Sequence, residues 1–308
     1  MDIELFKELN LTPQNGKLTE EQIAKVKGLG CLSDKRYDNV FNVRVITGNG
    51  KLSTKKHKVI IEAADRFGSG EVALTSRMTF EIQGVEYNNI PSLISFLKEN
   101  GIETGGTGPK VRPIVSCKGT TCRFGLIDTF SLSEKIHKLF YIGYHNEVLP
   151  HKFKIGVGGC PNNCVKPDLN DLGVIGQRIF TPDTEKCRGC AKCVIENSCP
   201  MNAAKVVDGK IKINPAICNK CGRCYLKCPF GVFSEAKEGY KIFIGGRWGK
   251  KTAMGKPLSQ ILESEEEVLS VIERAICLFR DEGIKGERFA DTIERLGFGY
   301  VEEKLLGK

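Results

Sequence analysis

The spacing of apolar and polar residues along the chain predicts a mixed α+β protein. Apolar residues that recur every three or four positions indicate amphipathic helices, and strict alternation indicates strands. By these patterns we expect helices within residues 2–30 and at residues 54–67, 91–99, 131–141, 264–279 and 287–296. We expect strands at residues 41–47, 72–76, 79–82, 111–116, 153–157, 172–177 and 240–244.

Residues that cap helices support several of these boundaries. The run Leu18 to Gln22 gives the first helical region a capped start. Ser53 is placed to cap the helix that begins at residue 54, and the glycines of Gly68–Gly70 end it. Ser264 and Glu267 form a capping box at the start of a later helix.

One segment interrupts these patterns and divides the chain. Between residues 181 and 238 the composition changes to dense Cys, Lys and Pro, and a strand resumes at residue 240. A strand that resumes after a self-contained module indicates an insertion into one α+β domain. A chain of 308 residues is long enough for two domains. We therefore expect the segments 1–68, 69–180, 181–238 and 239–308, the third of them being the insertion.

Fourteen cysteines are the next unusual feature. The N-terminus contains acidic residues and is no signal peptide, and no apolar run approaches the length of a membrane span. We therefore expect a cytoplasmic protein without a membrane segment, in which reduced thiols bind metal instead of forming disulfides. Twelve cysteines fall between Cys117 and Cys228, whereas Cys31 and Cys277 stand alone and are interpreted as structural thiols.

The formal net charge of +9 suits anionic ligands or an acidic electron donor, although a basic surface of no single purpose explains most lysines equally well. Basic and aromatic residues are not interleaved, so nucleic acid is not an expected partner. The loop Gly105–Gly108 is not followed by Gly-Lys-Ser/Thr, and no dinucleotide fingerprint is present. The chain is therefore not expected to bind a nucleotide of its own.

The insertion carries one cysteine pattern twice, about 30 residues apart. This is the bacterial two-cluster ferredoxin pattern, in which three close cysteines bind one [4Fe-4S] cluster and the distal cysteine binds the other. One cluster would be held by Cys187, Cys190, Cys193 and Cys228, and the second by Cys218, Cys221, Cys224 and Cys199. A pair of zinc sites is the alternative, but such sites favour paired C-x2-C arms.

Four more cysteines lie upstream of the insertion. They are Cys117, Cys122, Cys160 and Cys164. The second pair follows an expected strand and lies in a turn bordered by Gly158 and Gly159, where two thiolates can reach one metal centre. Four thiolates are enough for a third cubane.

Four local matches around these cysteines resemble the sulfite/nitrite reductase family, which couples a sirohaem to a [4Fe-4S] cluster through a shared cysteine. The matches are Leu74–Arg77 with the turn expected at residues 83–85, Gly108–Arg112, Leu149–Lys154 and Gly159–Cys164. With its inserted module and single copy of the family repeat, the chain looks most like the C-subunit branch of anaerobic, dissimilatory-type sulfite reductases.

This resemblance implies an α+β sirohaem-type reductase domain with an inserted bacterial two-[4Fe-4S] ferredoxin domain. Segment 1–68 would be the N-terminal helical and ferredoxin-like half-domain, and segment 69–180 would carry the sirohaem and its cluster. Segment 239–308 would supply the return strand and the C-terminal helices.

The resemblance also implies site residues. Cys117, Cys122, Cys160 and Cys164 would hold a cubane, and Cys164 would in addition bind the sirohaem iron. Arg77, Arg112, Lys152 and Lys154 would surround the distal face, binding the cofactor and acting in catalysis. Gly159 and Asn163 would contact the cofactor. The family usually spaces its first cysteine pair C-x5-C, whereas this chain has C-x4-C, and the difference concerns the geometry of that loop.

These residue types suit the reduction of a small oxyanion. Sulfite and the carboxylates of sirohaem are both anionic, and arginine offers them planar bidentate contacts where lysine offers a point charge. Reduction to sulfide takes six electrons and six protons, and lysines crowded by other cations can donate protons. The implied function is six-electron reduction of sulfite to sulfide, with electrons relayed through the ferredoxin-type clusters.

The implied electron donors are iron–sulfur and flavin subunits or an external ferredoxin. Having one copy of a repeat that larger relatives carry twice, the chain could also pair with itself or with a similar subunit. One alternative function is reduction of nitrite to ammonia on the same cofactors. Another is a non-catalytic electron-transfer or structural subunit. A plain ferredoxin fused to an unrelated domain would leave the four upstream cysteines unexplained.

Overall fold

The structure is a computed structural model that describes residues 17–307, so the helical start expected over residues 2–16 lies outside it. The chain divides into two compact units. Of the described residues, the first unit takes 17–115, 133–155 and 276–292, and the second takes 116–132, 156–275 and 293–307. Among residues 17–307, no helix has both the length and the apolar content needed to cross a membrane.

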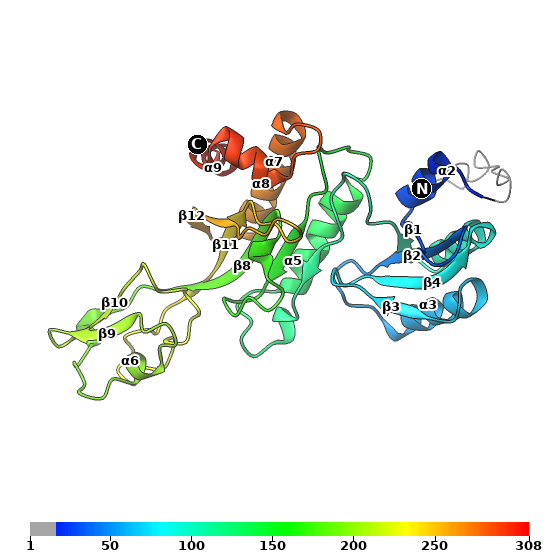
Figure 1. Cartoon of the computed structure of the whole chain (residues 1–308). Coiled ribbons are helices and arrows are strands. Elements are labelled where there is room, and N and C mark those ends of the chain that lie inside the picture. The colour runs from blue at the N-terminus through cyan, green and yellow to red at the C-terminus, as the bar shows by residue number, and fades with distance from the viewer. Residues whose placement is uncertain (1–16, 308) are drawn as a thin grey trace. The chain divides into compact units, whose positions relative to one another are not determined.

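The first unit is built on an antiparallel sheet with two helices packed on it (Figure 1). Its strands are β1 (Cys31–Ser33), β2 (Val40–Ile46), β3 (Val72–Leu74), β4 (Phe80–Glu86) and β5 (Glu103–Thr104), in the order β1-β2-β4-β3 with β5 on β2. Its helices are α2 (Glu20–Gly28), α3 (Thr54–Phe67) and α4 (Ile90–Glu99). Buried Val43 and Ile82 from the sheet meet Ile60 of α3 and Leu93 of α4 in one core. Because β4 pairs with β2 and β3 pairs with β4, this sheet continues past residue 68.

The predicted helix boundaries in this unit are confirmed closely. Thr19 and Gln22 make a full capping box at α2. The hydroxyl of Ser53 accepts the N–H of Lys56 at the start of α3. β4 differs from its prediction, because it continues through Gly84 to Glu86 instead of giving way to a turn. Gly84 has a φ of +68° there, beside a register shift in the pairing of β2 with β4.

The second sheet holds most of the second unit together. Its strands are β6 (Val115–Ser116), β7 (Ile155–Gly158), β8 (Leu172–Ile179), β11 (Lys237–Ile244) and β12 (Lys256–Leu262), in the order β12-β11-β8-β7-β6. The helices after and between them are α5 (Thr129–Ile136), which continues as the π-helix η3 (His137–Ile142), then α7 (Glu265–Glu282), α8 (Phe289–Leu296) and α9 (Phe298–Leu306). The capping box of Ser264 and Glu267 is confirmed at α7.

One predicted strand comes out differently, and some elements were not predicted. The strand expected over 111–116 is broken into a single bridge from Val111 to Phe153 and the two-residue β6. Pro113 lies between these pieces and has no N–H to give to a ladder. The sequence did not predict the strands β1, β5 and β12 or the helix α9. β1 and β5 are short, β12 does not alternate cleanly between apolar and polar residues, and α9 is also short.

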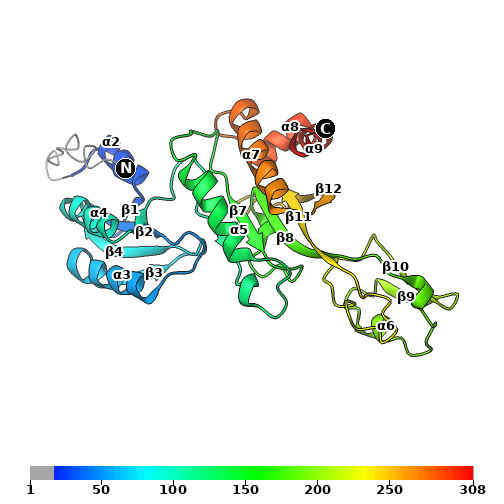
Figure 2. The same ribbon diagram turned by 180° about the vertical axis from the view of Figure 1, so that it is seen from behind.

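Residues 180–236 leave the second sheet and return to it at the neighbouring strand. The last residue of β8, Ile179, pairs with the first residue of β11, Lys237. Between them lie α6 (Val194–Ser198) and the hairpin of β9 (Ala204–Val207) and β10 (Lys210–Ile213), which Figure 2 shows from behind. This segment has a core of its own, made by Ile195, Ala204, Ile211, Val232 and Phe233 with cysteines packed around them.

Candidate functional site

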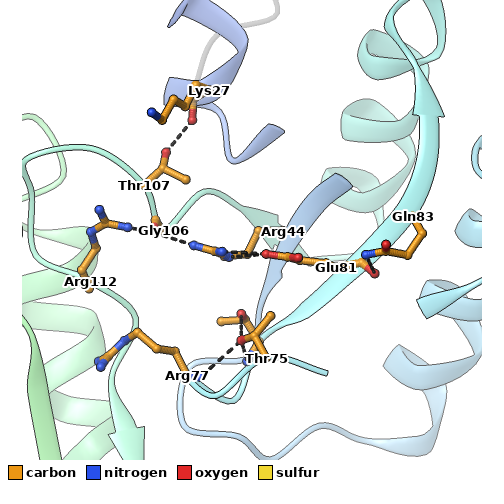
Figure 3. A network of polar contacts seen from close by, with 10 residues as sticks. Lys27, Arg44, Thr75, Arg77, Glu81, Gln83, Gly106, Thr107 and Arg112 are labelled. Carbon is orange, nitrogen blue, oxygen red and sulfur yellow. Dashed lines mark hydrogen bonds and ion pairs between the residues drawn. The ribbon is translucent and has the colours of Figure 1, made fainter. Parts of the chain in front are cut away.

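Arg77 lies in the tight turn that joins β3 to β4. The hydroxyl of Thr75 accepts the N–H groups of Arg77 and Thr79, both at 3.3 Å, which fixes the turn. The Arg77 guanidinium donates from Nε to the carbonyl of Pro113 at 3.2 Å and from Nη2 to the carbonyl of Ile155 at 3.3 Å. Arg77 therefore ties the β3–β4 turn to the two segments that lead toward the cysteines. Figure 3 shows it beside Arg112.

Arg112 is held by the glycine-rich loop before it. Its backbone N–H donates to the carbonyl of Phe153 at 2.8 Å, and its Nη1 donates to the carbonyl of Gly106. Arg44, which is paired with Glu81 at 2.6 Å, donates to the same carbonyl at 3.2 Å (Figure 3). Two guanidinium groups thus converge on one backbone oxygen. The glycine-rich loop therefore positions the side chains of Arg44 and Arg112 through the carbonyl of Gly106.

Lys152 and Lys154 join Arg112 around one imidazole. Burial lowers the pKa of His151, and the charges of Arg288, Lys152, Arg112 and Lys154 lower it further. Four cations must lie near His151 to act on it in this way. Three of the four predicted cationic residues therefore lie near His151. The fourth, Arg77, binds the backbone carbonyls of Pro113 and Ile155, which directly follow Arg112 and Lys154 in sequence.

Arg288 is a member of this group that the sequence reasoning missed. It stands immediately before α8, and its N–H donates to the carboxylate of Asp291 at 3.1 Å. It lies 134 positions after Lys154, outside every matched motif. No spacing rule connects residues so far apart, so only the fold could reveal this cation.

The second unit brings together the side chains of Cys117, Cys122, Cys160 and Cys164. Burial raises the pKa of Cys160, the N–H of Asn162 opposes this, and the other three cysteines raise it further. Mutual influence of this kind requires all four sulfurs to be close. The N–H of Gly159 also donates to Cys117 Sγ at 3.1 Å, a contact that stabilises a thiolate.

Two glycines explain why the two cysteine loops can meet. A Cβ on Gly159 would lie 2.7 Å from the Cα of Gly119, and a Cβ on Gly119 would lie 2.8 Å from the Cα of Gly159. The loops touch backbone to backbone at these positions, and Thr129 closes the contact from the side. Gly158 is similarly pressed against Pro167. The two glycines therefore allow the two cysteine loops to pack closely, and the contact of Gly159 with a cofactor stays a prediction.

Replacing Gly159 with alanine is expected to destabilise the protein by roughly 1–3 kcal/mol, because the new methyl group meets backbone that cannot move aside. Urea unfolding followed by circular dichroism measures the effect. Gly299→Ala is the matched control, since Gly299 lies inside α9 with nothing within 4 Å of its added Cβ. Equal stability of the two variants would contradict this account of the loop contact.

Asn163 has an unusual position in the Cys160–Cys164 loop. It adopts a left-handed backbone with φ of 55°, and its Nδ2 donates to Asp168 Oδ1 at 2.9 Å. Its Oδ1 is buried and makes no hydrogen bond among the residues that the structure describes. A buried oxygen without a donor is costly unless a ligand supplies one. This atom therefore suits contact with a bound group.

The inserted segment contains two cavities, and each is lined by one of the predicted cysteine quartets. The first cavity includes Cys187, Cys190, Cys193 and Cys228. The second includes Cys199, Cys218, Cys221 and Cys224. In both, the distal cysteine comes from the other copy of the repeat. Both cavities are walled largely by apolar side chains, the environment that protein-bound [4Fe-4S] clusters occupy.

The local electrostatics follow the same grouping. Burial raises the pKa of Cys224 to about 12, and Cys218, Cys221 and Cys199 contribute to the rise. Burial also acts to raise the pKa of Cys199, but the backbone N–H groups of residues 201–204 outweigh it and the pKa is lowered. The N–H of Ile211 donates to Cys187 Sγ at 3.3 Å. The N–H donors around Cys199 therefore favour its thiolate, whereas burial disfavours the thiolate of Cys224.

A third cavity connects the two cysteine regions of the second unit. Its lining includes Cys160 from the upstream quartet and Cys221 from the insertion. Arg178 of β8 lies 4.6 Å from the ring centroid of Tyr225, which holds the insertion against the sheet. Cys160 and Cys221 therefore face one common space.

Within residues 17–307, no three or more His, Cys, Asp or Glu side chains converge as the ligands of one metal ion would. A cubane differs in this respect, because each thiolate binds a different iron atom and the four sulfurs stand farther apart. The two quartets of the insertion each line a cavity, an arrangement that suits a cluster.

Comparison with known proteins identifies matching families over most of the chain. Residues 107–307 match the family described as nitrite and sulphite reductase 4Fe-4S domain. Residues 34–100 match the nitrite/sulfite reductase ferredoxin-like half domain. The second match covers the strands β2, β3 and β4 and the helices α3 and α4 of the first unit.

Individual relatives agree with these families. The C subunit of the anaerobic sulfite reductase of Salmonella typhimurium is 30% identical, over 92% of this chain and 88% of its own length. The coenzyme F420-dependent sulfite reductase of Methanocaldococcus jannaschii is 30% identical over 87% of this chain, which spans 43% of that relative's length. The crystal structure of dissimilatory sulfite reductase I aligns with 87% of this chain and 69% of its own chain at a TM-score of 0.68 and 24% identity, and it shows the fold.

Proposed function

The chain belongs to the nitrite and sulphite reductase family, and from this premise we propose that it reduces sulfite to sulfide at a sirohaem coupled to a [4Fe-4S] cluster. It is an oxidoreductase of an iron–sulfur family. The observation that carries the proposal is the gathering of twelve cysteines into three groups of four. Three cubanes and one sirohaem are the cofactors that these groups and the family suit.

The cationic group supports the choice of an oxyanion as substrate. Arg112, Lys152, Lys154 and Arg288 all act on His151, so a doubly charged anion would find four compensating charges. Sequence links this group to the cysteines, since Arg112 precedes Cys117 by five residues and Lys154 precedes Cys160 by six. Extended chain spans at most about 3.6 Å per residue, so each cation stays within roughly 20 Å of its cysteine.

The reaction assigns work to these side chains. Conversion of hydrogen sulfite to HS⁻ takes up six electrons and six protons and releases three molecules of water. Cys164 would hold the sirohaem beside the cluster of the upstream quartet, and these cofactors would supply the electrons. Arginine would hold the substrate oxygens, and Lys152 and Lys154 would give protons to each oxygen as it leaves as water. Asn163 Oδ1 would accept a hydrogen bond from the bound substrate or cofactor.

The shared cavity suggests an order for the electrons. Cys221 faces Cys160, so the quartet of Cys199, Cys218, Cys221 and Cys224 would pass electrons to the upstream quartet. The quartet of Cys187, Cys190, Cys193 and Cys228 would be the first to receive electrons, from a donor protein. The donor would be an iron–sulfur or flavin subunit or a ferredoxin.

Nitrite is the second candidate substrate, because the family name includes it and the same cations would bind it. The test is an anaerobic preparation assayed for iron, labile sulfide and visible spectrum, followed by turnover with reduced methyl viologen. We expect sirohaem bands, about twelve non-haem irons per chain, and faster turnover of sulfite than of nitrite. Absence of sirohaem bands, or a preference for nitrite, would contradict the proposal.

A further inference from the structure

The cavity lined by Cys187, Cys190, Cys193 and Cys228 opens onto a cationic face. Arg188, Lys192 and Lys227 line this cavity, and all three side chains are exposed. No acidic residue is part of the lining. Elsewhere in the segment lysines are paired with acids, as Lys212 is with Asp208 at 3.0 Å and Lys205 with Glu196 at 3.2 Å. The charges on this face are arranged differently, with cations grouped around one opening.

Exposed apolar side chains lie among these cations. Val194 is 44% exposed and Phe230 is 45% exposed, although both are large hydrophobic residues at the cavity mouth. The Arg188 guanidinium lies 5.9 Å from the centroid of the Phe230 ring. Apolar groups within a charged rim are the arrangement found at protein–protein interfaces. We call the face formed by Arg188, Lys192, Val194, Lys227 and Phe230 the basic face.

The second cysteine cavity of the insertion lacks this arrangement. Among the residues that line it, Arg223 is the single charged side chain. Cys221 and Arg223 also line the cavity shared with Cys160, so this quartet lies next to the upstream cysteines. The two quartets thus differ in their surroundings, and the one next to the basic face is the one suited to contact with another molecule.

We propose that the basic face docks an acidic redox protein that delivers electrons to the quartet of Cys187, Cys190, Cys193 and Cys228. This inference rests on the proposed function, since it presumes a cluster at that quartet. Complementary charge steers such a partner and raises its association rate, and the apolar centre excludes water at short range. A small anion would need no exposed Phe230 and Val194, and nucleic acid would need a more extended basic surface than three residues.

The test uses the cluster-loaded chain and, as the donor probe, an acidic plant-type [2Fe-2S] ferredoxin. Binding is measured by calorimetry at low and moderate salt. We expect Lys192→Glu and Lys227→Glu each to weaken binding at least tenfold, and we expect wild-type affinity to fall as salt rises. Lys212→Glu is the matched control, with the same change of charge in the same segment outside the basic face, and it should stay within about twofold of wild type.

Two further readings separate the docking proposal from the proposed function. The electron paramagnetic resonance spectrum and the turnover with reduced methyl viologen should be unchanged in Lys192→Glu, because neither depends on docking. Lys227→Glu is judged by binding alone, since Lys227 also lines the cavity shared by Cys160 and Cys221. Wild-type affinity at Lys192→Glu and Lys227→Glu, or a loss equal to that of Lys212→Glu, would overturn the docking proposal. Tighter binding of a DNA duplex than of the ferredoxin would overturn it as well. Lack of methyl viologen turnover in the wild type would instead overturn the proposed function and leave the binding result to stand.

Discussion

Replacing Lys154 with methionine is expected to lower the rate of sulfite reduction about 10²–10³-fold, the range for loss of a positioned proton donor or charge. Lys154 is one of four cations whose charges lower the pKa of His151. Methionine keeps the length of the side chain and removes both the charge and the proton. Steady-state turnover with reduced methyl viologen and sulfite provides the measurement.

The visible spectrum decides how Lys154 acts. An unchanged spectrum with a lower kcat assigns the residue to protonation, whereas lost sirohaem bands assign it to binding of the cofactor. Lys55→Met is the control. Lys55 is exposed on α3, and its replacement removes the same charge from the same unit. Turnover by Lys154→Met within about threefold of that control would contradict a catalytic role for the cationic group.

The cationic group shows where sequence reasoning succeeds and where it ends. Arg112, Lys152 and Lys154 could be found because each lies in a short run that resembles a family motif, and the resemblance to that family is confirmed by the matches over residues 34–100 and 107–307. Arg288 could not be found, because it reaches the group through the return of the chain at α8. Long-range convergence leaves no local pattern.

The fold follows the same division. α3 was predictable to the residue, since Ser53 caps it and Gly68 ends it, and both effects act within one turn. The break at Pro113 was predictable in principle from its missing N–H, yet the apolar run around it suggested a continuous strand. The contact of Gly119 with Gly159 was not predictable, because it depends on two loops forty residues apart meeting backbone to backbone.

The C-x4-C spacing of Cys117 and Cys122 has a local explanation in the structure. The residues between them form the 3-10 helix η2 (Gly119–Thr121), and the N–H of Cys122 donates to the carbonyl of Gly119 at 3.1 Å. Thr129 accepts the N–H of Thr120 and donates to the carbonyl of Cys117 at 2.7 Å. The shorter loop is therefore closed by its own hydrogen bonds, with both sulfurs near Cys160.

Exchanging Cys199 for alanine is expected to remove the same cluster as exchanging Cys224, although the two residues belong to different copies of the repeat. Cys199 lines the cavity of Cys218, Cys221 and Cys224, and it acts on the pKa of Cys224. Loss of one ligand should cost about four irons per chain. Iron analysis and the electron paramagnetic resonance spectrum of the reduced protein measure which cluster is lost.

The reciprocal pair sharpens this prediction. Cys228 lines the cavity of Cys187, Cys190 and Cys193, so Cys228→Ala and Cys193→Ala should lose a common signal that survives in Cys199→Ala. Cys277→Ala, which changes a half-buried cysteine of α7 outside both quartets, should keep all the iron. If Cys199→Ala instead shared its lost signal with Cys193→Ala, each copy of the repeat would hold its own cluster. The cluster nearest to Cys160 would then have a different ligand set. Cys221, which lines the cavity shared with Cys160, would bind the same cluster as Cys228 instead of Cys199.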